Sequence, residues 1–326
     1  MTTIADLGEQ EVLKRLHRFC AQEVGDDAAV QSLPAQQQLV VTTDVLVDGV
    51  HFSDRTLSPL DLGWRAAAVN LSDLAAMGSV PLGITVGLTL PPHTPWPWLE
   101  AVYQGLSDCL GTYGGAVLGG DLCRGLHRSL AITALGTVHQ HRALYRDRAQ
   151  VGQALVSTGI HGASRAGLAL LLGELETSSS VQAWTVAHQR PIPRFDAIAV
   201  LNGLNPNINT VAAMDTSDGL ADAVIQMCTQ SQVGAALMRS QLPMPSGLVD
   251  AVGLATATQW TLYGGEDFEL LLSLPQPMAT EFIQQLPGSQ IVGYITAKPD
   301  ICLVDDMTHG PDIYLDQSQG FQHFDA

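Results

Sequence analysis

Short apolar runs typical of strands alternate with helical segments along most of this 326-residue chain. Residues 83–90 (GITVGLTL) and 129–138 (SLAITALGTV) have the near-continuous apolar content of buried strands. Residues 61–77 and 96–113 are predicted helices, the first of them rich in alanine and leucine. Because strands and helices alternate through both halves, the sequence predicts an α/β or α+β protein.

The length of the chain allows two ordinary domains. A polar cluster at residues 148–152 precedes a new apolar strand, so we predict domains at residues 1–148 and 149–326. We expect neither a membrane span nor a signal peptide. No apolar run reaches the length of a bilayer, and the N-terminal MTTIADLGEQEVLKRL carries charge throughout.

The overall charge of the chain argues against some classes of binding partner. Thirty-two acidic residues stand against 15 basic ones, which gives a formal net charge of −17. That balance repels nucleic-acid backbones and anionic membrane surfaces, so neither is an expected partner. The five cysteines are widely spaced and contain no CxxC pair. We therefore expect reduced, mostly buried thiols in a cytoplasmic protein, and neither a disulfide framework nor a zinc site.

Aspartate and lysine are used unevenly. The sequence has 23 Asp but 9 Glu, and its two lysines are Lys14 and Lys298. An excess of Asp is typical of caps, loops and metal sites, because Glu is the better helix former. Neither lysine lies in a P-loop or in the VAIK motif of protein kinases. Any nucleotide site in this chain is therefore of another kind.

Much of the aspartate falls in five short motifs, each flanked by Gly, Ser, Thr or Asn. They are Gly25–Asp27, Thr42–Asp44, Asn70–Asp73, Gly119–Asp121 and Asp215–Gly219. Carboxylates gathered beside a core repel one another, and bound Mg²⁺ would offset this cost. Any one motif alone is better explained as a helix cap or a turn. Asp73 resists that explanation, because it lies in the middle of a predicted helix.

Taken together, the motifs resemble a known family. They read GDDAAV, TTDVLVDGVHF, NLSDLAAMG, GGD, RALYR, STGIHGASRAGL, AHQRPIPR, DTSDGL and GGEDFELL. The pattern resembles the thiamine-monophosphate kinases from about residue 8 to residue 324. The wider superfamily includes aminoimidazole ribonucleotide synthetase, selenophosphate synthetase and a hydrogenase-maturation protein. The pair His51-Phe52 and the form of NLSDLAAMG favour the kinase branch.

The resemblance implies a fold, an activity and an assembly. The fold is that of aminoimidazole ribonucleotide synthetase, with an N-terminal mixed sheet that joins two chains into a homodimer and a C-terminal α/β domain. The near-continuous apolar strands are consistent with burial of that sheet on both faces. The activity is ATP-dependent phosphorylation of thiamine monophosphate to thiamine diphosphate. It proceeds by direct in-line transfer assisted by several Mg²⁺ ions, with no covalent nucleophile and no general base.

The resemblance also implies roles for individual residues. The implied metal ligands are Asp27, Thr42, Thr43, Asp44, Asp73, Asp121, Asp215 and Asp218. The implied ATP contacts are Gly120, Asp121, Arg146 and Ser217, and the implied thiamine-side contacts are His51, Glu266 and Phe321. Phe321 stands where the family often has Tyr or Trp, so it keeps a stacking face without a polar group. Glu23-Val24 replaces the family's usual Gly-Ile ahead of GDD.

Other interpretations remain open at this stage. The chain could be another ATP-using enzyme of the same superfamily, like the aminoimidazole ribonucleotide synthetase. It could also be a non-catalytic, nucleotide-binding maturation factor. A lone histidine such as His51 is more often a hydrogen-bonded structural residue, and Glu266 could form a turn ahead of a strand. We interpret Arg190 and Arg194 as structural residues.

Overall fold

The computed structural model describes residues 2–21, 31–176, 182–204, 207–307 and 310–321. The chain forms two compact units: Met1–Leu74 with Ser79–Gln140, and Ala75–Gly78 with His141–Ala326. Each unit contains a mixed β-sheet and α-helices, which confirms the predicted two-domain α/β (α+β) class. The roles predicted for the two domains stay predictions.

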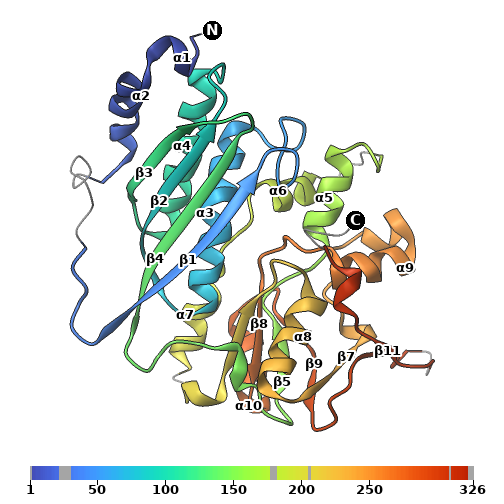
Figure 1. Cartoon of the computed structure of the whole chain (residues 1–326). Helices are drawn as coiled ribbons and strands as arrows, with labels where there is room; N and C mark the ends of the chain where they lie inside the picture. Colours follow the sequence, from blue (N-terminus) through green and yellow to red (C-terminus); the bar gives the residue numbers. More distant parts are fainter. Residues whose placement is uncertain (1, 22–30, 177–181, 205–206, 308–309, 322–326) are drawn as a thin grey trace. The chain divides into compact units, whose positions relative to one another are not determined.

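The first unit is built on a four-stranded sheet of order β1-β4-β2-β3 (Figure 1). Its elements are α1 (Ile4–Leu7), α2 (Glu9–Leu16), β1 (Gln37–Val47), α3 (Pro59–Ala76), β2 (Val80–Leu90), α4 (Trp96–Tyr113), β3 (Val117–Arg124) and β4 (Ser129–His139). Strand β4 pairs antiparallel with β1 and β2, whereas β2 and β3 are parallel. Gly8, whose φ is +76°, separates α1 from α2.

One face of this sheet carries the core of the unit. Ile84 lies opposite Ala134 and Val86 lies opposite Ile132, and all four side chains are fully buried. Neighbouring residues along a strand point to opposite faces. On the opposite face of β1 the apolar side chains of Leu39, Val41 and Val45 are about half exposed, with values of 47%, 55% and 49%. In the part of the chain that the structure describes, this face of β1 is therefore not fully covered.

Helices α3 and α4 pack closely enough for their backbones to touch. A Cβ atom at Gly63 of α3 would overlap the carbonyl oxygen of Val102, and one at Gly105 of α4 would overlap that of Leu60. Each helix thus presents a glycine to the backbone of the other. A side chain at either position would force the helices apart.

The second unit is built on a seven-stranded sheet of order β11-β10-β7-β9-β5-β8-β6. Its strands are β5 (Ala154–Ser157), β6 (Ala212–Asp215), β7 (Gly234–Met238), β8 (Leu270–Leu274), β9 (Gln290–Thr296), β10 (Ile301–Val304) and β11 (Ile313–Tyr314). Its helices are α5 (Ala163–Leu171), α6 (Gln182–Gln189), α7 (Phe195–Gly203), α8 (Leu220–Ser231), α9 (Leu248–Tyr263) and α10 (Gln276–Gln285). Helices α6, α7 and α9 and strands β7 and β10 were not predicted from the sequence.

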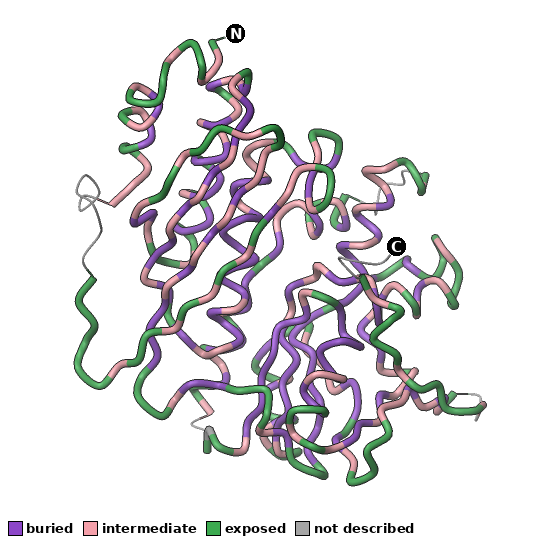
Figure 2. The backbone as a smooth tube through the Cα atoms, viewed as in Figure 1, coloured by how far each residue is buried: buried purple, intermediate pink, exposed green. Residues whose placement is uncertain are grey.

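This sheet is buried on both faces. Leu155 and Leu271 contribute to a cluster with α8, whereas their neighbours Val156 and Leu272 contribute to a cluster with α7 and α10. Figure 2 shows β5 and β8 buried along their length, while β1 of the first unit is largely intermediate or exposed. A third apolar cluster joins α5, α6 and α9. Among the described helices, none is both long and apolar enough to cross a membrane.

Candidate functional site

The first unit brings two of the aspartate motifs together. Thr42 and Asp44 lie on the same face of β1, because side chains alternate along a strand. Thr42 Oγ1 donates a hydrogen bond to Asp73 Oδ2 of α3 at 2.5 Å. The backbone N–H of Asp44 donates to Asn70 Oδ1 of the same helix at 3.0 Å. The TTD and NLSD motifs thus form a single polar cluster between strand and helix.

Asn70 and Asp73 lie three residues apart and therefore share one face of α3. Asn70 is fully buried, and its Nδ2 donates to the carbonyl oxygen of Ala66 at 3.0 Å, which leaves Oδ1 for Asp44. Asp73 lies in the last turn of α3, later in the helix than the sequence predicts, and its carboxylate faces Thr42. Carboxylate and hydroxyl oxygens are the donors that Mg²⁺ prefers, so the chemistry of the cluster fits this cation.

Two predicted residues of the first unit lie on the other side of the sheet. The register places Asp121 opposite Gly87, Gly87 opposite Ala131 and Ala131 opposite Val45. Asp121 therefore shares the face of Val45, not that of Asp44, and Cys123 Sγ on the same face donates to its Oδ2 at 3.2 Å. Thr43 is also on this face and contacts Thr133, with 2.8 Å between the Oγ1 atoms. Gly120 is aligned with Asp44 across the four strands of the sheet.

His51 follows β1 in a tight loop. Its backbone N–H donates to the carbonyl oxygen of Val47 at 2.9 Å, and the N–H of Val47 donates to His51 Nδ1 at 3.1 Å. The ring is thus oriented by the end of the strand that carries Thr42 and Asp44. Asp27, predicted as a metal ligand, lies outside the described residues. Among the described residues, no three His, Cys, Asp or Glu side chains are grouped as metal ligands.

The second unit gathers the late motifs DTSDG and GGED. Asp215 ends β6, and Ser217 Oγ lies 3.5 Å from Asp215 Oδ1. The backbone N–H of Glu266 donates to the carbonyl oxygen of Ser217 at 2.6 Å. Gly265 has a φ of +65°, and a Cβ atom there would lie 2.9 Å from the same carbonyl oxygen. Glycine is therefore required where the two loops approach each other.

Glu266 adopts a φ of +61°, a left-handed conformation that costs free energy for a residue with a side chain. Its Oε2 lies 3.6 Å from Nδ1 of His188, a residue of α6 with 2% side-chain exposure. His188 Nδ1 in turn lies 3.0 Å from Ser164 Oγ of α5. Strained backbone of this kind persists where the surrounding structure holds it, and it is frequent at functional sites.

The neighbours of Glu266 serve the scaffold. Asp267 accepts hydrogen bonds from the N–H groups of Gly162 and Ser164 at 2.7 and 2.8 Å, so its carboxylate caps α5. Burial raises the pKa of Asp267 to about 7, against the opposing effect of these two N–H donors. Glu269 accepts from Thr158 Oγ1 at 2.6 Å and pairs with Arg194.

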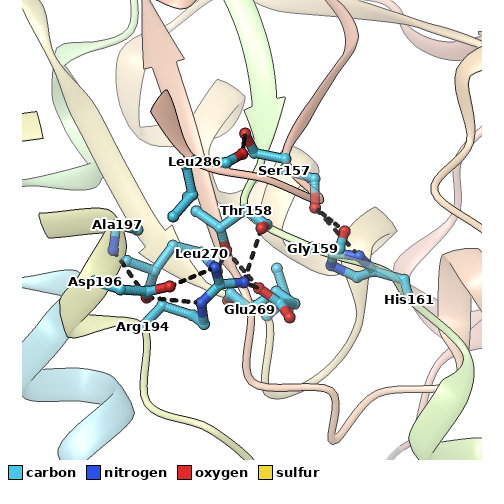
Figure 3. A network of polar contacts seen from close by, with 12 residues as sticks. Ser157, Thr158, Gly159, His161, Arg194, Asp196, Ala197, Glu269, Leu270 and Leu286 are labelled. Carbon is cyan, nitrogen blue, oxygen red and sulfur yellow. Dashed lines mark hydrogen bonds and ion pairs between the residues drawn. The ribbon is translucent and has the colours of Figure 1, made fainter. Parts of the chain in front are cut away.

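Arg194 is the centre of the buried network drawn in Figure 3. Its Nε and Nη2 each donate to Asp196 at 2.9 Å, and its Nη1 donates to the carbonyl oxygen of Thr158 at 2.7 Å. These contacts connect the loop before α7 to β5 and β8. They agree with the structural role that the sequence predicts for Arg194.

Arg146 and Phe321 lie beside helix α8 and the loop before it. Arg146 Nη1 donates to Gln226 Oε1 of α8 at 2.5 Å, and Arg146 is exposed. Phe321 is 58% exposed. A Cβ atom at the preceding Gly320 would lie 3.7 Å from the carbonyl oxygen of Asp218. Arg146 thus contacts α8, whereas Gly320, next to Phe321, lies close to Asp218 of the DTSDG loop.

Comparison with known proteins connects these motifs to a family. Residues 25–138 match the family described as AIR synthase related protein, N-terminal domain. The thiamine-monophosphate kinase of Synechococcus elongatus is 46% identical over 99% of this chain and 98% of its own length. The chain belongs to the thiamine-monophosphate kinase family. Its resemblance in sequence to that family is thereby confirmed.

Solved structures of thiamine-monophosphate kinases have the same fold. The enzyme from Stenotrophomonas maltophilia is 31% identical, covers 92% of this chain and 96% of its own, and has a TM-score of 0.78. A structure described as AaThiL complexed with AMPPCP and TMP is 27% identical, covers 96% and 98%, and has a TM-score of 0.74. That relative was therefore crystallised with an ATP analogue and TMP together.

Two residues beside the site were not singled out by the sequence as candidates. His188 belongs to the motif AHQRPIPR, which carries the resemblance to the thiamine-monophosphate kinases, but only the fold places it against Glu266. Arg128 belongs to no quoted motif. It lies just before β4 and binds both ends of the loop that carries His51. Nothing in the local sequence marks Arg128, because the loop lies far from it along the chain.

Proposed function

We propose that this chain phosphorylates thiamine monophosphate with ATP, giving thiamine diphosphate and ADP. The observation that carries the proposal is the 46% identity to a thiamine-monophosphate kinase over 99% of the chain. The similarity to a relative in complex with AMPPCP and TMP supports both substrates. The phosphoryl group passes directly and in line from ATP to the acceptor.

The chemistry of the acceptor explains why we propose no general base. The second pKa of a phosphate monoester is about 6, so the acceptor oxygen is already anionic near neutral pH. The difficulty is to bring two polyanions together, since two unit charges about 4 Å apart interact by about 4 kcal/mol at an effective dielectric of about 20. Positioning and charge stabilisation therefore supply most of the catalysis.

The acidic motifs hold the cations that this reaction needs. Bound Mg²⁺ supplies positive charge between the phosphates of ATP and the acceptor phosphate. The residues that we propose hold it, directly or through water, are Asp27, Thr42, Asp44, Asp73, Asp215 and Asp218, together with Thr43 and Asp121 on the opposite face of the four-stranded sheet. The hydrogen bonds of Thr42 with Asp73 and of Asp44 with Asn70 support this role, because they fix oxygen donors in one place.

The remaining predicted residues bind the two substrates. Gly120, Asp121, Arg146 and Ser217 contact ATP, with Arg146 as a fixed cation beside α8. His51, Glu266 and Phe321 contact the thiamine side, and the exposed ring of Phe321 offers a stacking face. The backbone hydrogen bond from Glu266 to Ser217 supports both assignments, because it holds a proposed ATP contact next to a proposed thiamine contact within one unit.

The proposed assembly is a homodimer joined through the four-stranded sheets. The half-exposed side chains of Leu39, Val41 and Val45 support it, because an apolar sheet face of this kind is a typical interaction surface. The proposed location is the cytoplasm. The free state of all five cysteines supports this location. Two of the cysteines are buried, two are intermediate and Cys123 is exposed, so fewer thiols are buried than the sequence predicts.

The test is a coupled assay of the purified chain with ATP and thiamine monophosphate, with and without Mg²⁺. We expect ADP and thiamine diphosphate in equal amounts, and none when the cation is chelated. Formylglycinamidine ribonucleotide, the substrate of the synthetase alternative, serves as the comparison acceptor. Binding of ATP without ADP release would refute the proposal and favour a maturation factor.

A further inference from the structure

The loop that carries His51 is fastened by a residue far away in sequence. Arg128 lies just before β4, and its Nε donates to Asp48 Oδ2 at 2.7 Å. Its Nη1 and Nη2 donate to the two carboxylate oxygens of Asp54 at 2.7 and 3.0 Å. Asp48 and Asp54 lie on either side of His51, so one guanidinium closes the loop at both ends. Two-point pairing of this kind needs the planar fork of arginine.

Arg128 is itself held in place. Its Cζ lies 5.0 Å from the ring centroid of Trp98 and 5.9 Å from that of Phe52, and its side chain is 16% exposed. The N–H of Asp48 also donates to the carbonyl oxygen of Arg128 at 3.0 Å. Aromatic rings and a backbone hydrogen bond therefore fix the guanidinium before it pairs with the aspartates. Such a contact sets geometry more than it adds to stability.

The fastened loop also sets the orientation of the His51 ring. The N–H of Val47 donates to His51 Nδ1 at 3.1 Å, so Nδ1 acts as the acceptor. In a neutral imidazole the other nitrogen then carries the proton. The ring of His51 is thus oriented by the loop that Arg128 fastens.

We propose that Arg128 is a positioning residue for thiamine monophosphate binding, acting through His51. Arg128 holds the loop of residues 48–54 so that the ring of His51 is oriented for contact with the substrate. The inference rests on the proposed function, because it takes thiamine monophosphate as the ligand on the His51 side. Arg128 touches neither the substrate nor the reacting atoms.

The first test compares Arg128→Gln and Arg128→Lys with Arg15→Gln. Arg15 is a matched control, because it also pairs with a carboxylate (Glu11, 2.8 Å) and lies over an indole (Trp96, 5.3 Å). We expect Arg128→Gln to raise the KM for thiamine monophosphate about tenfold while the KM for ATP changes less than about twofold. Arg128→Lys should recover part of the loss, and Arg15→Gln should behave as the wild type. Equal changes in both KM values would overturn the proposal.

The second test asks whether Arg128 acts through His51. In a double-mutant cycle, Arg128→Gln should raise the KM for thiamine monophosphate less than about twofold when His51 is already replaced by alanine. A further increase of about tenfold in that background would mean that the two residues act independently, which contradicts the proposal.

The third test does not depend on turnover. Amide hydrogen exchange of residues 48–54 should be faster in Arg128→Gln than in the wild type and in Arg15→Gln. Unchanged exchange would show that Arg128 does not fasten the loop. A wild-type chain that gave no thiamine diphosphate would refute the proposed function, and the exchange data would still decide on the fastening. If Arg128→Gln failed to fold, Arg128→Lys would carry all three measurements.

Discussion

Asp73 lies in the last turn of α3 (Pro59–Ala76), where a carboxylate is unfavourable because it faces the negative end of the helix dipole. The structure places it against Thr42 of β1, within a cluster that also contains Asp44 and Asn70. Replacement by asparagine keeps the shape of each carboxylate and removes its charge. The predicted loss of activity therefore concerns electrostatics and not packing.

We expect Asp44→Asn and Asp73→Asn each to lower kcat/KM by on the order of 100-fold, because charge stabilisation of this size is typical of preorganised sites. Asp108→Asn is the control, since Asp108 is exposed on α4 of the same unit and accepts a hydrogen bond from Gln104 at 2.8 Å. The measurement is steady-state turnover at saturating Mg²⁺. Full activity in either cluster variant would contradict the role assigned to these residues.

His161 provides a prediction about pH. It is fully buried near Ser157, and burial lowers the pKa of its imidazole to about 4 (Figure 3). The neutral ring therefore favours the fold above pH 6.5, and this contribution is lost as the pH falls from about 6.5 through 4, because the unfolded chain binds the proton first.

We expect wild-type stability to fall by about 2–3 kcal/mol more than that of His161→Gln between about pH 7 and about pH 4.5. Urea denaturation of both proteins at the two pH values measures the difference. Parallel losses in the two proteins would show that His161 titrates normally in the fold.

Among the secondary-structure elements, helices α3 and α4 pack so closely that a side chain does not fit at some positions between them. A Cβ atom at Gly105 would overlap the carbonyl oxygen of Leu60 on α3. A Cβ atom at Gly111 of the same helix would meet no neighbouring atom of the described residues within 4 Å. The two glycines thus differ in surroundings and not in secondary structure.

Gly105→Ala should destabilise the protein by about 1–3 kcal/mol, since backbone atoms cannot move aside as a flexible side chain can. Gly111→Ala should instead stabilise it by about 0.5–1 kcal/mol, because alanine loses less conformational freedom in a helix. Thermal denaturation of the two variants measures both effects. A loss of stability in Gly111→Ala as large as in Gly105→Ala would rule out the packing explanation.

For the whole molecule, the exposed face of the four-stranded sheet is the proposed dimer interface. We expect Val41→Lys to shift the proposed dimer toward monomer, because it places a charge in an apolar interface. Val151→Lys is the control: Val151 is 56% exposed against 55% for Val41, but lies in a turn of the second unit. Light scattering after size-exclusion chromatography gives the mass. Equal masses for wild type and Val41→Lys would locate the interface elsewhere or exclude a dimer.

Elements with a strong local pattern were predictable from the sequence. The helix at residues 96–113 has the predicted bounds, and the strand predicted at residues 129–138 is one residue longer, because amphipathic spacing and an apolar run are local signals. Helix α9 escaped prediction. It contains a kink at Gly253, where φ is +78°, which interrupts the helical periodicity, and it packs against α5 and α6.

For the candidate site too, some features follow from the sequence and others only from the fold. The sequence by itself determined which residue types are present: aspartates beside Gly, Ser and Thr, no P-loop lysine, and motifs that place the chain in its family. Only the tertiary structure decided which of them meet, because strand register and helix packing connect residues far apart in the chain. It joined Thr42 to Asp73, turned Asp121 to the opposite face of the sheet, and brought Arg128 to the loop of His51.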